Sequence, residues 1–288
     1  MTDLKCLTTR EVARLCRVSD ATVKRWAEAD LLKSERTNGG HRRFRAEEVA
    51  RFQRDLNLGL KITHGDESIA KAKSRRLESI GQTGSPLFNS LLAGCEEGTA
   101  KQLIDSHLNG TPLVEIFDSL ISAVMCEVGE RWASGELTVT QEHVATRAAF
   151  AAMHKLRNVL PVPQLNGNVA MCCAIEGDLH ELPTYMAQLT IENEGWEVIN
   201  FGATTPVYGL IEEIAAHPPK LVCISATVIV DPERLFRDYR EFREKASRLR
   251  IPVILGGRAF SEPRMRERFP AELYAGSFAE VAEFVRTV

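Results

Sequence analysis

From residue 168 to the C-terminus, short apolar runs alternate with longer amphipathic stretches. This alternation is typical of strands and helices that follow one another, and it restricts the segment to a parallel, doubly wound five-stranded sheet of the α/β class. The predicted strands are Val169–Ile175, Glu197–Phe201, Leu221–Ser225, Pro252–Leu255 and Leu273–Ala275. Ligands of such sheets bind beyond the carboxyl ends of the strands, so the residues that follow each strand are the first candidates for a site.

Residues 86–163 have helical periodicity instead, in four runs over 86–95, 98–109, 112–133 and 138–160. Four amphipathic runs with short connections predict a four-helix bundle. Pro161 and Pro163 end this region. Residues 59–85 mix Gly, Ser, Lys and Arg without periodicity, and we interpret them as a linker.

Residues 1–58 carry the signals of an all-α winged helix-turn-helix domain. Thr8 or Thr9 can cap a helix that ends near Cys16, and Ser19 or Asp20 can cap a second helix over Ala21–Ala29. The link between them is very short, which is typical of a helix-turn-helix. Asn38-Gly39-Gly40 predicts a hairpin turn, and a third helix is expected over Ala46–Asn57.

Charge is distributed unevenly along the chain. Residues 1–83 contain 18 Lys and Arg against 12 Asp and Glu, although the whole chain has a net charge of −3. A basic first part on an acidic body indicates a polyanion partner for the first part only. The second helix would enter the major groove of DNA, and the hairpin would contact it as a wing. The predicted DNA-binding residues are Thr22, Lys24, Arg25, Arg36, His41, Arg42 and Arg43.

Composition excludes several other classes of protein. An apolar content of 44% is ordinary for a globular chain, and no run approaches the roughly 18 apolar residues of a membrane span. The first residues contain no apolar stretch of signal-peptide length, so we expect a cytoplasmic protein without a membrane partner. The seven cysteines show no metal-ligand spacing and are interpreted as small buried apolar residues.

Residues 7–53 resemble the MerR family of regulators. LTTREVARLCRVSDATVKRWAEADLL, followed by RTNGGHRRF, matches the pattern of that family. The resemblance implies binding to operator DNA near promoters as a dimer or a larger homo-oligomer.

The segment Glu176–Pro183 follows the first strand of the predicted sheet and contains Asp178 and His180. Such a pair can be an ordinary polar loop contact. Alternatively, the histidine ligates a metal through one ring nitrogen, while the carboxylate holds the other N–H. Later spacing favours a site: 41 residues separate Pro183 from Ser225, at the end of the third strand, and 28 separate Thr227 from Gly256.

This pattern resembles the cobalamin-binding domain of methionine synthase and the corrinoid mutases, over residues 168–288. The matching motifs are Asp-x-His, then Ser225-x-Thr227, then Gly256-Gly257. The resemblance implies a Rossmann-like domain in which His180 replaces the benzimidazole of the cofactor under the cobalt, with Asp178 as its partner. It also implies that the nucleotide tail lies against Ser225, Thr227, Gly256 and Gly257. Pro183 and Thr227 depart from the family, which has Gly and often Leu at these positions.

The third and fourth runs of the bundle add Trp132, followed after nine residues by Glu142 and His143. This signature resembles the CarH-type adenosylcobalamin-dependent photoreceptor repressors, which have the same domain order. The resemblance implies that Trp132, Val139, Glu142 and His143 wall in the 5′-deoxyadenosyl group. These light sensors carry a cobalt-ligating His after the Trp, and this chain carries Ala133. Either the photoproduct differs, or light is not the signal.

The main hypothesis is a non-enzymatic, light-responsive repressor that binds adenosylcobalamin. The state of the bound cobalamin would control oligomer size, a dimer or tetramer, and through it DNA affinity. The alternative is a cobalamin-independent MerR-type regulator whose sensor domain binds haem, another tetrapyrrole or a protein partner. A corrinoid enzyme or methyl carrier is disfavoured by the DNA-binding domain.

Overall fold

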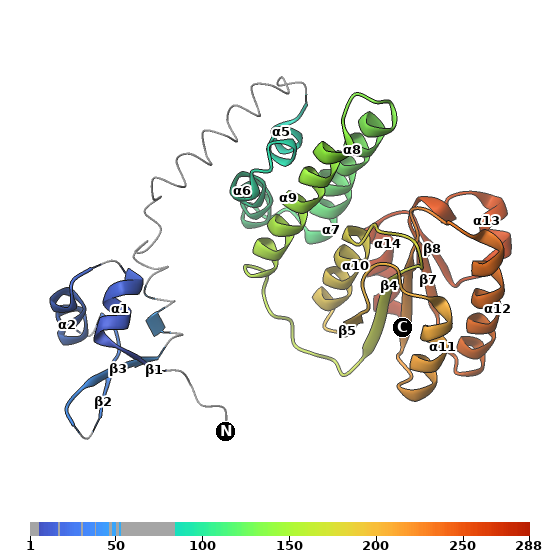
Figure 1. The fold of residues 1–288 in the computed structure, drawn as a ribbon. Coiled ribbons are helices and arrows are strands. Elements are labelled where there is room, and N and C mark those ends of the chain that lie inside the picture. The colour runs from blue at the N-terminus through green and yellow to red at the C-terminus, as the bar shows by residue number, and fades with distance from the viewer. Residues whose placement is uncertain are drawn as a thin grey trace. The chain divides into compact units, whose positions relative to one another are not determined.

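The computed structural model describes residues 6–16, 18–29, 31–37, 39–45, 48, 49, 52 and 84–288. The chain divides into two compact units, Met1–Ala72 and Lys73–Val288, and each is described by itself (Figure 1). Most of the predicted third helix over 46–57, and all of the predicted linker except residues 84 and 85, lie outside the described residues.

The N-terminal unit joins two helices to a small antiparallel sheet of order β1-β3-β2. Its elements are β1 (Cys6–Thr8), α1 (Thr9–Cys16), α2 (Asp20–Glu28), β2 (Glu35–Arg36) and β3 (Arg42–Arg45). The hairpin β2–β3 is the predicted wing. The strand β1, which pairs with β3 from Cys6 to Thr8, was not predicted.

Both predicted helix starts are capped by hydroxyl side chains. Glu11 N donates to Thr8 Oγ1 at 3.2 Å, and the Glu11 carboxylate accepts from Thr8 N at 2.7 Å, which is a capping box. Ser19 caps α2 by accepting from Thr22 N. Between the helices and the wing lies a buried core that includes Val12, Val23 and Phe44.

The second unit begins with the bundle. Its helices are α5 (Pro86–Leu92), α6 (Glu96–Leu108), α7 (Leu113–Glu115), η1 (Ile116–Ser122), α8 (Ala123–Ala133) and α9 (Val139–Arg157). The segments α7, η1 and α8 follow one another directly, so they form the single predicted helix over 112–133. Its middle part, η1, is π-helical, which the periodicity did not indicate.

The predicted parallel sheet is present, with the order β5-β4-β6-β7-β8. The strands are β4 (Val169–Ala174), β5 (Glu197–Asn200), β6 (Leu221–Ser225), β7 (Val253–Gly256) and β8 (Leu273–Ala275). The elements between and after them are α10 (Leu182–Asn193), α11 (Val207–Ala216), α12 (Pro232–Arg248), η2 (Arg258–Phe260), α13 (Pro263–Arg268) and α14 (Phe278–Thr287). Helices α10 and α14 cover one face of the sheet, and α11 and α12 cover the other (Figure 1).

The bundle shares its core with helix α10, because Leu182, Tyr185, Met186 and Leu189 are buried among bundle residues. Polar contacts reinforce this packing, since the Tyr185 hydroxyl lies 2.9 Å from Nδ1 of His154 on α9. The bundle is therefore held close to the loop that carries Asp178 and His180. In the part of the chain that the structure describes, every helix is too short or too polar to cross a membrane.

Candidate cofactor site and nucleic-acid interface

Asp178 and His180 lie on the loop between β4 and α10, at the carboxyl edge of the sheet. The Asp178 side chain is fully buried. Its Oδ1 accepts from His180 Nδ1 at 2.6 Å and from the His180 backbone N at 3.0 Å. Its Oδ2 accepts from the Thr227 backbone N at 2.5 Å. Because an ionised carboxylate only accepts, it holds the proton on Nδ1 and leaves Nε2 of His180 available as a ligand.

The pKa values of the pair reflect these contacts. Burial raises the pKa of Asp178. Hydrogen bonds from His180 and Thr227 and the charge of His180 together lower it by more, so the pKa lies below its usual value. The hydrogen bond to Asp178 raises the pKa of His180, burial lowers it, and the charges of Asp178 and Glu142 raise it again. The net pKa of His180 is above its usual value. The smallest of these contributions comes from Glu142, which lies on α9 of the bundle.

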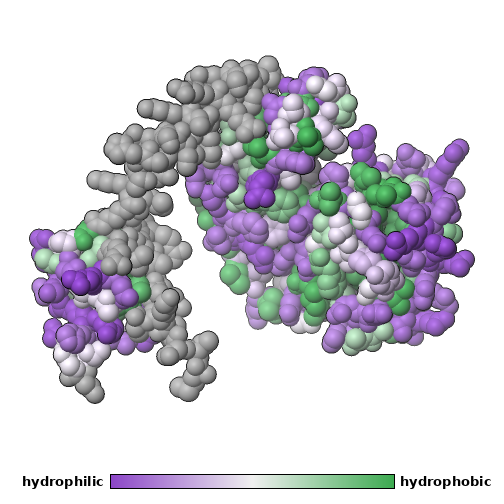
Figure 2. Space-filling model, in the orientation of Figure 1, coloured by the Kyte–Doolittle hydropathy of each residue, from purple (hydrophilic) through white to green (hydrophobic). Residues whose placement is uncertain are grey.

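Exposed apolar side chains follow three neighbouring strands at the same edge. Leu179 is 81% exposed and Val230 is 70% exposed, although most of the visible face of residues 84–288 is hydrophilic (Figure 2). Phe201, directly after β5, and Val228, after β6, are also exposed. We name these four side chains the apolar rim. The sequence analysis missed them, although their positions in the loops after the strands were a usable signal.

Ser225 and Gly257 lie at the ends of β6 and β7. The Ser225 hydroxyl is buried, and it has no hydrogen-bond partner among the described residues. Gly257 has a φ of +94°, and a Cβ there would lie 2.4 Å from the Ala226 carbonyl oxygen. A Cβ on Gly256 would meet only ordinary contacts, the nearest at 3.8 Å. Gly257 is therefore required by the adjoining backbone, whatever its part in binding a nucleotide tail.

Four predicted residues lie around the connection between α8 and α9. Trp132 and Val139 are each about half exposed. The Glu142 carboxylate accepts from Thr146 Oγ1 at 2.7 Å, and its other oxygen lies 3.6 Å from Nε2 of the largely exposed His143. Ala133 ends α8 beside Trp132.

Pro183 occupies the first turn of α10, after the N-cap Glu181. A proline is compatible with this position because the first N–H groups of a helix have no partner within the helix.

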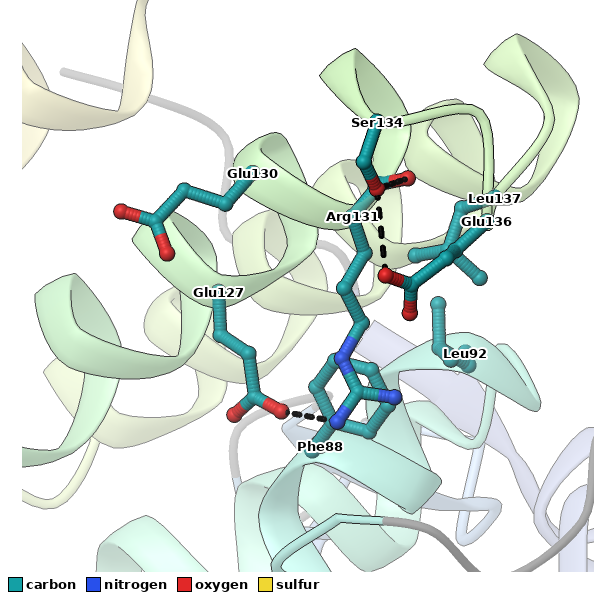
Figure 3. A pocket seen from close by; sticks show the side chains of 8 residues that line it. All are labelled: Phe88, Leu92, Glu127, Glu130, Arg131, Ser134, Glu136 and Leu137. Carbon is teal, nitrogen blue, oxygen red and sulfur yellow. Dashed lines mark hydrogen bonds and ion pairs between the residues drawn. The ribbon is translucent and has the colours of Figure 1, made fainter.

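A separate hollow of about 780 Å³ lies on the bundle, between α5 and the end of α8 (Figure 3). It is lined by Phe88, Leu92, Glu127, Glu130, Arg131, Ser134, Glu136 and Leu137. Arg131 extends into it, over the Phe88 ring, and pairs with Glu127 at 2.6 Å. None of the predicted cofactor residues lines this hollow, so its size does not identify the site.

The predicted DNA-binding residues lie on α2 and the wing. Lys24, Arg25, Arg36 and His41 are exposed. Arg42 differs, because its side chain is 15% exposed and pairs with Glu28 of α2 at 3.2 Å.

Thr22 and Arg43 complete the predicted DNA-binding residues. The Thr22 hydroxyl lies 2.9 Å from that of Ser19. Arg43 lies in β3, opposite Thr8 and Glu35. Glu28, which the sequence analysis missed, joins the wing to α2 through Arg42.

Comparison with known proteins gives matches along most of the chain. A helix-turn-helix domain matches residues 6–56, and B12 binding domains match residues 87–157 and 169–283. The HTH-type transcriptional repressor CarH of Myxococcus xanthus is 24% identical, over 92% of this chain and 93% of that protein. A methionine synthase of Mycobacterium tuberculosis is 25% identical over 73% of this chain, which spans only 18% of that enzyme.

Among solved structures, the monomethylamine corrinoid protein of Methanosarcina barkeri superposes with a TM-score of 0.61 at 21% identity. The match covers 70% of this chain and 96% of that one, and it supports the fold. The chain thus combines a helix-turn-helix domain with B12-binding domains, which is the organisation of a CarH-like, cobalamin-binding and DNA-binding regulator.

Proposed function

We propose that this chain is a transcriptional repressor whose operator binding is controlled by bound cobalamin, with adenosylcobalamin as the bound form. The observation that carries the proposal is the buried Asp178 carboxylate, which fixes Nδ1 of His180 at 2.6 Å. His180 would hold the cobalt through Nε2, and Asp178 would keep the ring in that tautomer and orientation.

The surroundings fit a large, mostly apolar cofactor with a polar tail. The apolar rim offers contacts to a macrocycle at the carboxyl edge of the sheet. The buried Ser225 hydroxyl needs a hydrogen-bond partner, which a polar tail would supply. On the bundle side, Trp132, Val139, Glu142 and His143 would enclose the upper face.

When bound, adenosylcobalamin supplies a cobalt–carbon bond that light can break. Control of DNA binding then requires that the cofactor state change the oligomer, a dimer or tetramer, and that the oligomer present α2 and the wing to DNA with different affinity. With Ala133 beside Trp132, this chain has no imidazole at that position to take the cobalt afterwards. Light sensing is tested separately, by the spectrum and the oligomer size before and after illumination.

The test is a spectral titration of the purified full chain with adenosylcobalamin in the dark. We expect binding by the wild-type chain, and weaker binding or a spectrum without protein ligation in His180→Ala. His217→Ala is a matched control, because Nδ1 of His217 also contacts a carboxylate, that of Glu213 at 3.2 Å. Wild-type affinity and spectrum in His180→Ala would overturn the assignment.

Binding of haem instead of cobalamin, or no binding of either, would favour the alternative of a cobalamin-independent regulator. Band shifts with a promoter fragment from the same genome, with and without adenosylcobalamin, test the regulatory part. Equal DNA affinity under both conditions would contradict control by the cofactor.

A further inference from the structure

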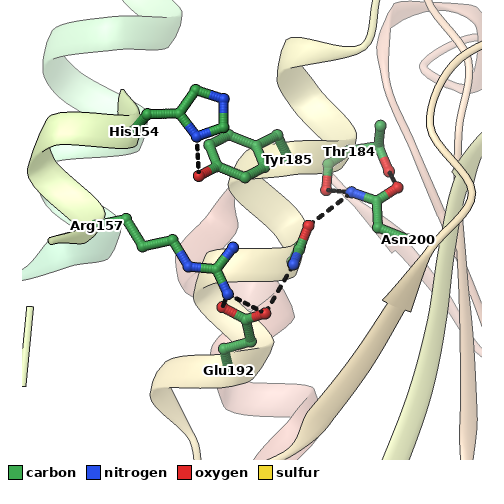
Figure 4. A network of polar contacts seen from close by, with 7 residues as sticks. His154, Arg157, Thr184, Tyr185, Glu192 and Asn200 are labelled. Atoms are coloured by element: carbon green, nitrogen blue, oxygen red, sulfur yellow. Dashed lines mark hydrogen bonds and ion pairs between the residues drawn. The ribbon is translucent and has the colours of Figure 1, made fainter. Parts of the chain in front are cut away.

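Polar side chains form a continuous chain of hydrogen bonds from the bundle to the end of strand β5 (Figure 4). Arg157 Nη2, on α9, donates to the Glu192 carboxylate of α10 at 2.8 Å. The same carboxylate accepts from Gln188 Nε2 at 2.7 Å. Gln188 Oε1 in turn accepts from Asn200 Nδ2 at 2.9 Å. We name these four side chains the α9–β5 relay.

Asn200, the last residue of β5, uses its whole amide. Its Oδ1 accepts from Gly202 N at 2.9 Å and from Thr184 Oγ1 at 3.3 Å. Its Nδ2 donates to Gln188 and, at 3.4 Å, to the Thr184 carbonyl. A side-chain amide donates and accepts at the same time, which an apolar side chain cannot do. An apolar replacement would therefore leave the buried Thr184, the partly buried Gln188 and the Gly202 N–H without these partners.

The segment that Asn200 caps supports the proposed cobalt-ligating loop. We name residues 201–205 the β5 loop. Thr204 N donates to the Asp178 carbonyl at 3.1 Å, and Thr205 N donates to the Ala174 carbonyl at 2.9 Å. Ala174 N donates to the Gly202 carbonyl at 2.8 Å. The β5 loop therefore holds the backbone of Asp178, while Thr227 N holds its carboxylate.

The β5 loop contains a conformation that needs external support. Thr204 has a φ of +52°, in the left-handed region that residues with a Cβ rarely adopt. Such a residue persists where its surroundings fix it. The hydrogen bond from Thr204 N to the Asp178 carbonyl and the one from Gly202 N to Asn200 are two of the contacts that support it.

We infer that Asn200 is a positioning residue for Asp178 and His180, and that the α9–β5 relay makes this positioning depend on bundle helix α9. The inference extends the proposed cobalamin site, and the test that measures cofactor affinity depends on that proposed function. The order of the β5 loop can be measured without any cofactor, so the two can fail separately.

The first experiment measures hydrogen exchange of the full, cofactor-free chain at the amides of Gly202, Thr204 and Thr205. We expect exchange to be about 10-fold faster in Asn200→Ala and Gln188→Ala, and about 3-fold faster in Arg157→Ala. The control is Arg286→Ala, because Arg286 pairs with Glu194 at 2.6 Å, two residues beyond Glu192 and outside the relay. The control should leave these amides unchanged.

Buried amides of β6 and β7 report global opening in the same samples. If a variant speeds exchange there equally, it has lost global stability rather than local order. Gln188→Ala then decides, because among the described residues the hydrogen bonds of Gln188 reach the β5 loop only through Asn200. An effect confined to the β5 loop in that variant supports the relay. Global destabilisation in Gln188→Ala as well would overturn it.

The second experiment separates a relay from independent contacts. In the Gln188→Ala background, Arg157→Ala should have no further effect on the β5 loop, because the chain is already broken. Effects that add, or no effect of Arg157→Ala alone, would overturn the coupling to α9. For adenosylcobalamin, Asn200→Ala should weaken binding about 10-fold and Arg286→Ala less than about 2-fold. Wild-type affinity in Asn200→Ala would overturn its positioning role, whereas no binding by the wild-type chain would overturn only the proposed function.

Discussion

At the scale of single residues, the proposed site is organised around the carboxylate of Asp178. Asp178 is fully buried, and each of its two oxygens accepts at least one hydrogen bond from the loops after β4 and β6. A side chain in this position orients His180 and joins two loops at the same time. Its replacement therefore affects both the ligand tautomer and the shape of the site.

We expect Asp178→Asn to weaken adenosylcobalamin binding by about 10-fold, the usual size of such effects on a ligand's partner. The amide presents an N–H group to one of the N–H donors that now contact the carboxylate. Spectral titration measures the change. Asp231→Asn, which alters a carboxylate that caps α12, is the control. Affinity within about 2-fold of the wild type would show that the carboxylate is not needed.

The raised pKa of His180 predicts a pH dependence of cofactor affinity. Cobalt ligation needs an unprotonated Nε2, so affinity should fall as the pH drops through the raised pKa of His180. Glu142 contributes to that raised pKa, so Glu142→Gln should move the midpoint of the loss to lower pH. Titrations between about pH 5 and pH 9 measure it, with Glu213→Gln as the control. An unmoved midpoint in Glu142→Gln would contradict the prediction.

At the scale of elements, the wing and α2 act as one surface because Arg42 and Glu28 join them. Arg43 is not part of this ion pair, so it is the better probe of phosphate contact. Arg43→Ala should reduce the slope of log affinity against log salt by about 0.9. Band shifts at several salt concentrations measure it, and Arg264→Ala, on exposed α13, is the control. An unchanged slope would remove Arg43 from the interface.

The π-helical segment η1 presents Asp118 to the start of α14. The carboxylate accepts from Phe278 N at 2.8 Å and from Ala279 N at 3.1 Å. Two first-turn N–H groups would lose this partner in Asp118→Ala, so we expect a loss of about 1–2 kcal/mol in the free energy of unfolding. Denaturant titration measures it. Asp105→Ala, which breaks an exposed pair with Lys101 on α6, should cost less than about 0.5 kcal/mol. Equal losses in the two variants would refute the role of η1.

At the scale of the whole molecule, the light response should differ from that of regulators with a His after the Trp. We expect illumination to break the cobalt–carbon bond of bound adenosylcobalamin, because this reactivity belongs to the cofactor. With Ala133, the light state should release corrinoid more readily, unless His143 becomes a ligand. Gel filtration with spectral detection, before and after illumination, measures retention and oligomer size. A stable spectrum of two imidazole ligands that persists in His143→Ala would sink the prediction.

The sequence predicted the fold class and most of its elements, but it did not predict the contacts between side chains that are far apart in the chain. Strand β6 lies where its continuous apolar run predicted it, since a strand that is buried on both faces has a continuous apolar sequence. Strand β1 has only three residues, too few for a periodicity. The contact between Asp178 and His180 follows from their close spacing. The α9–β5 relay joins residues up to 43 positions apart, from 157 to 200, and depends on how α9 packs against α10.

Gly257 offers a way to sort related chains. Any side chain there would strike the Ala226 carbonyl and would also have to adopt a φ of +94°. No substitution at this position is conservative, because even alanine would force the ends of β6 and β7 apart. Because the contact lies within the protein backbone and involves no ligand, the restriction applies equally to chains with and without a cofactor. A different residue at this position should therefore mark related chains in which the ends of β6 and β7 are arranged differently.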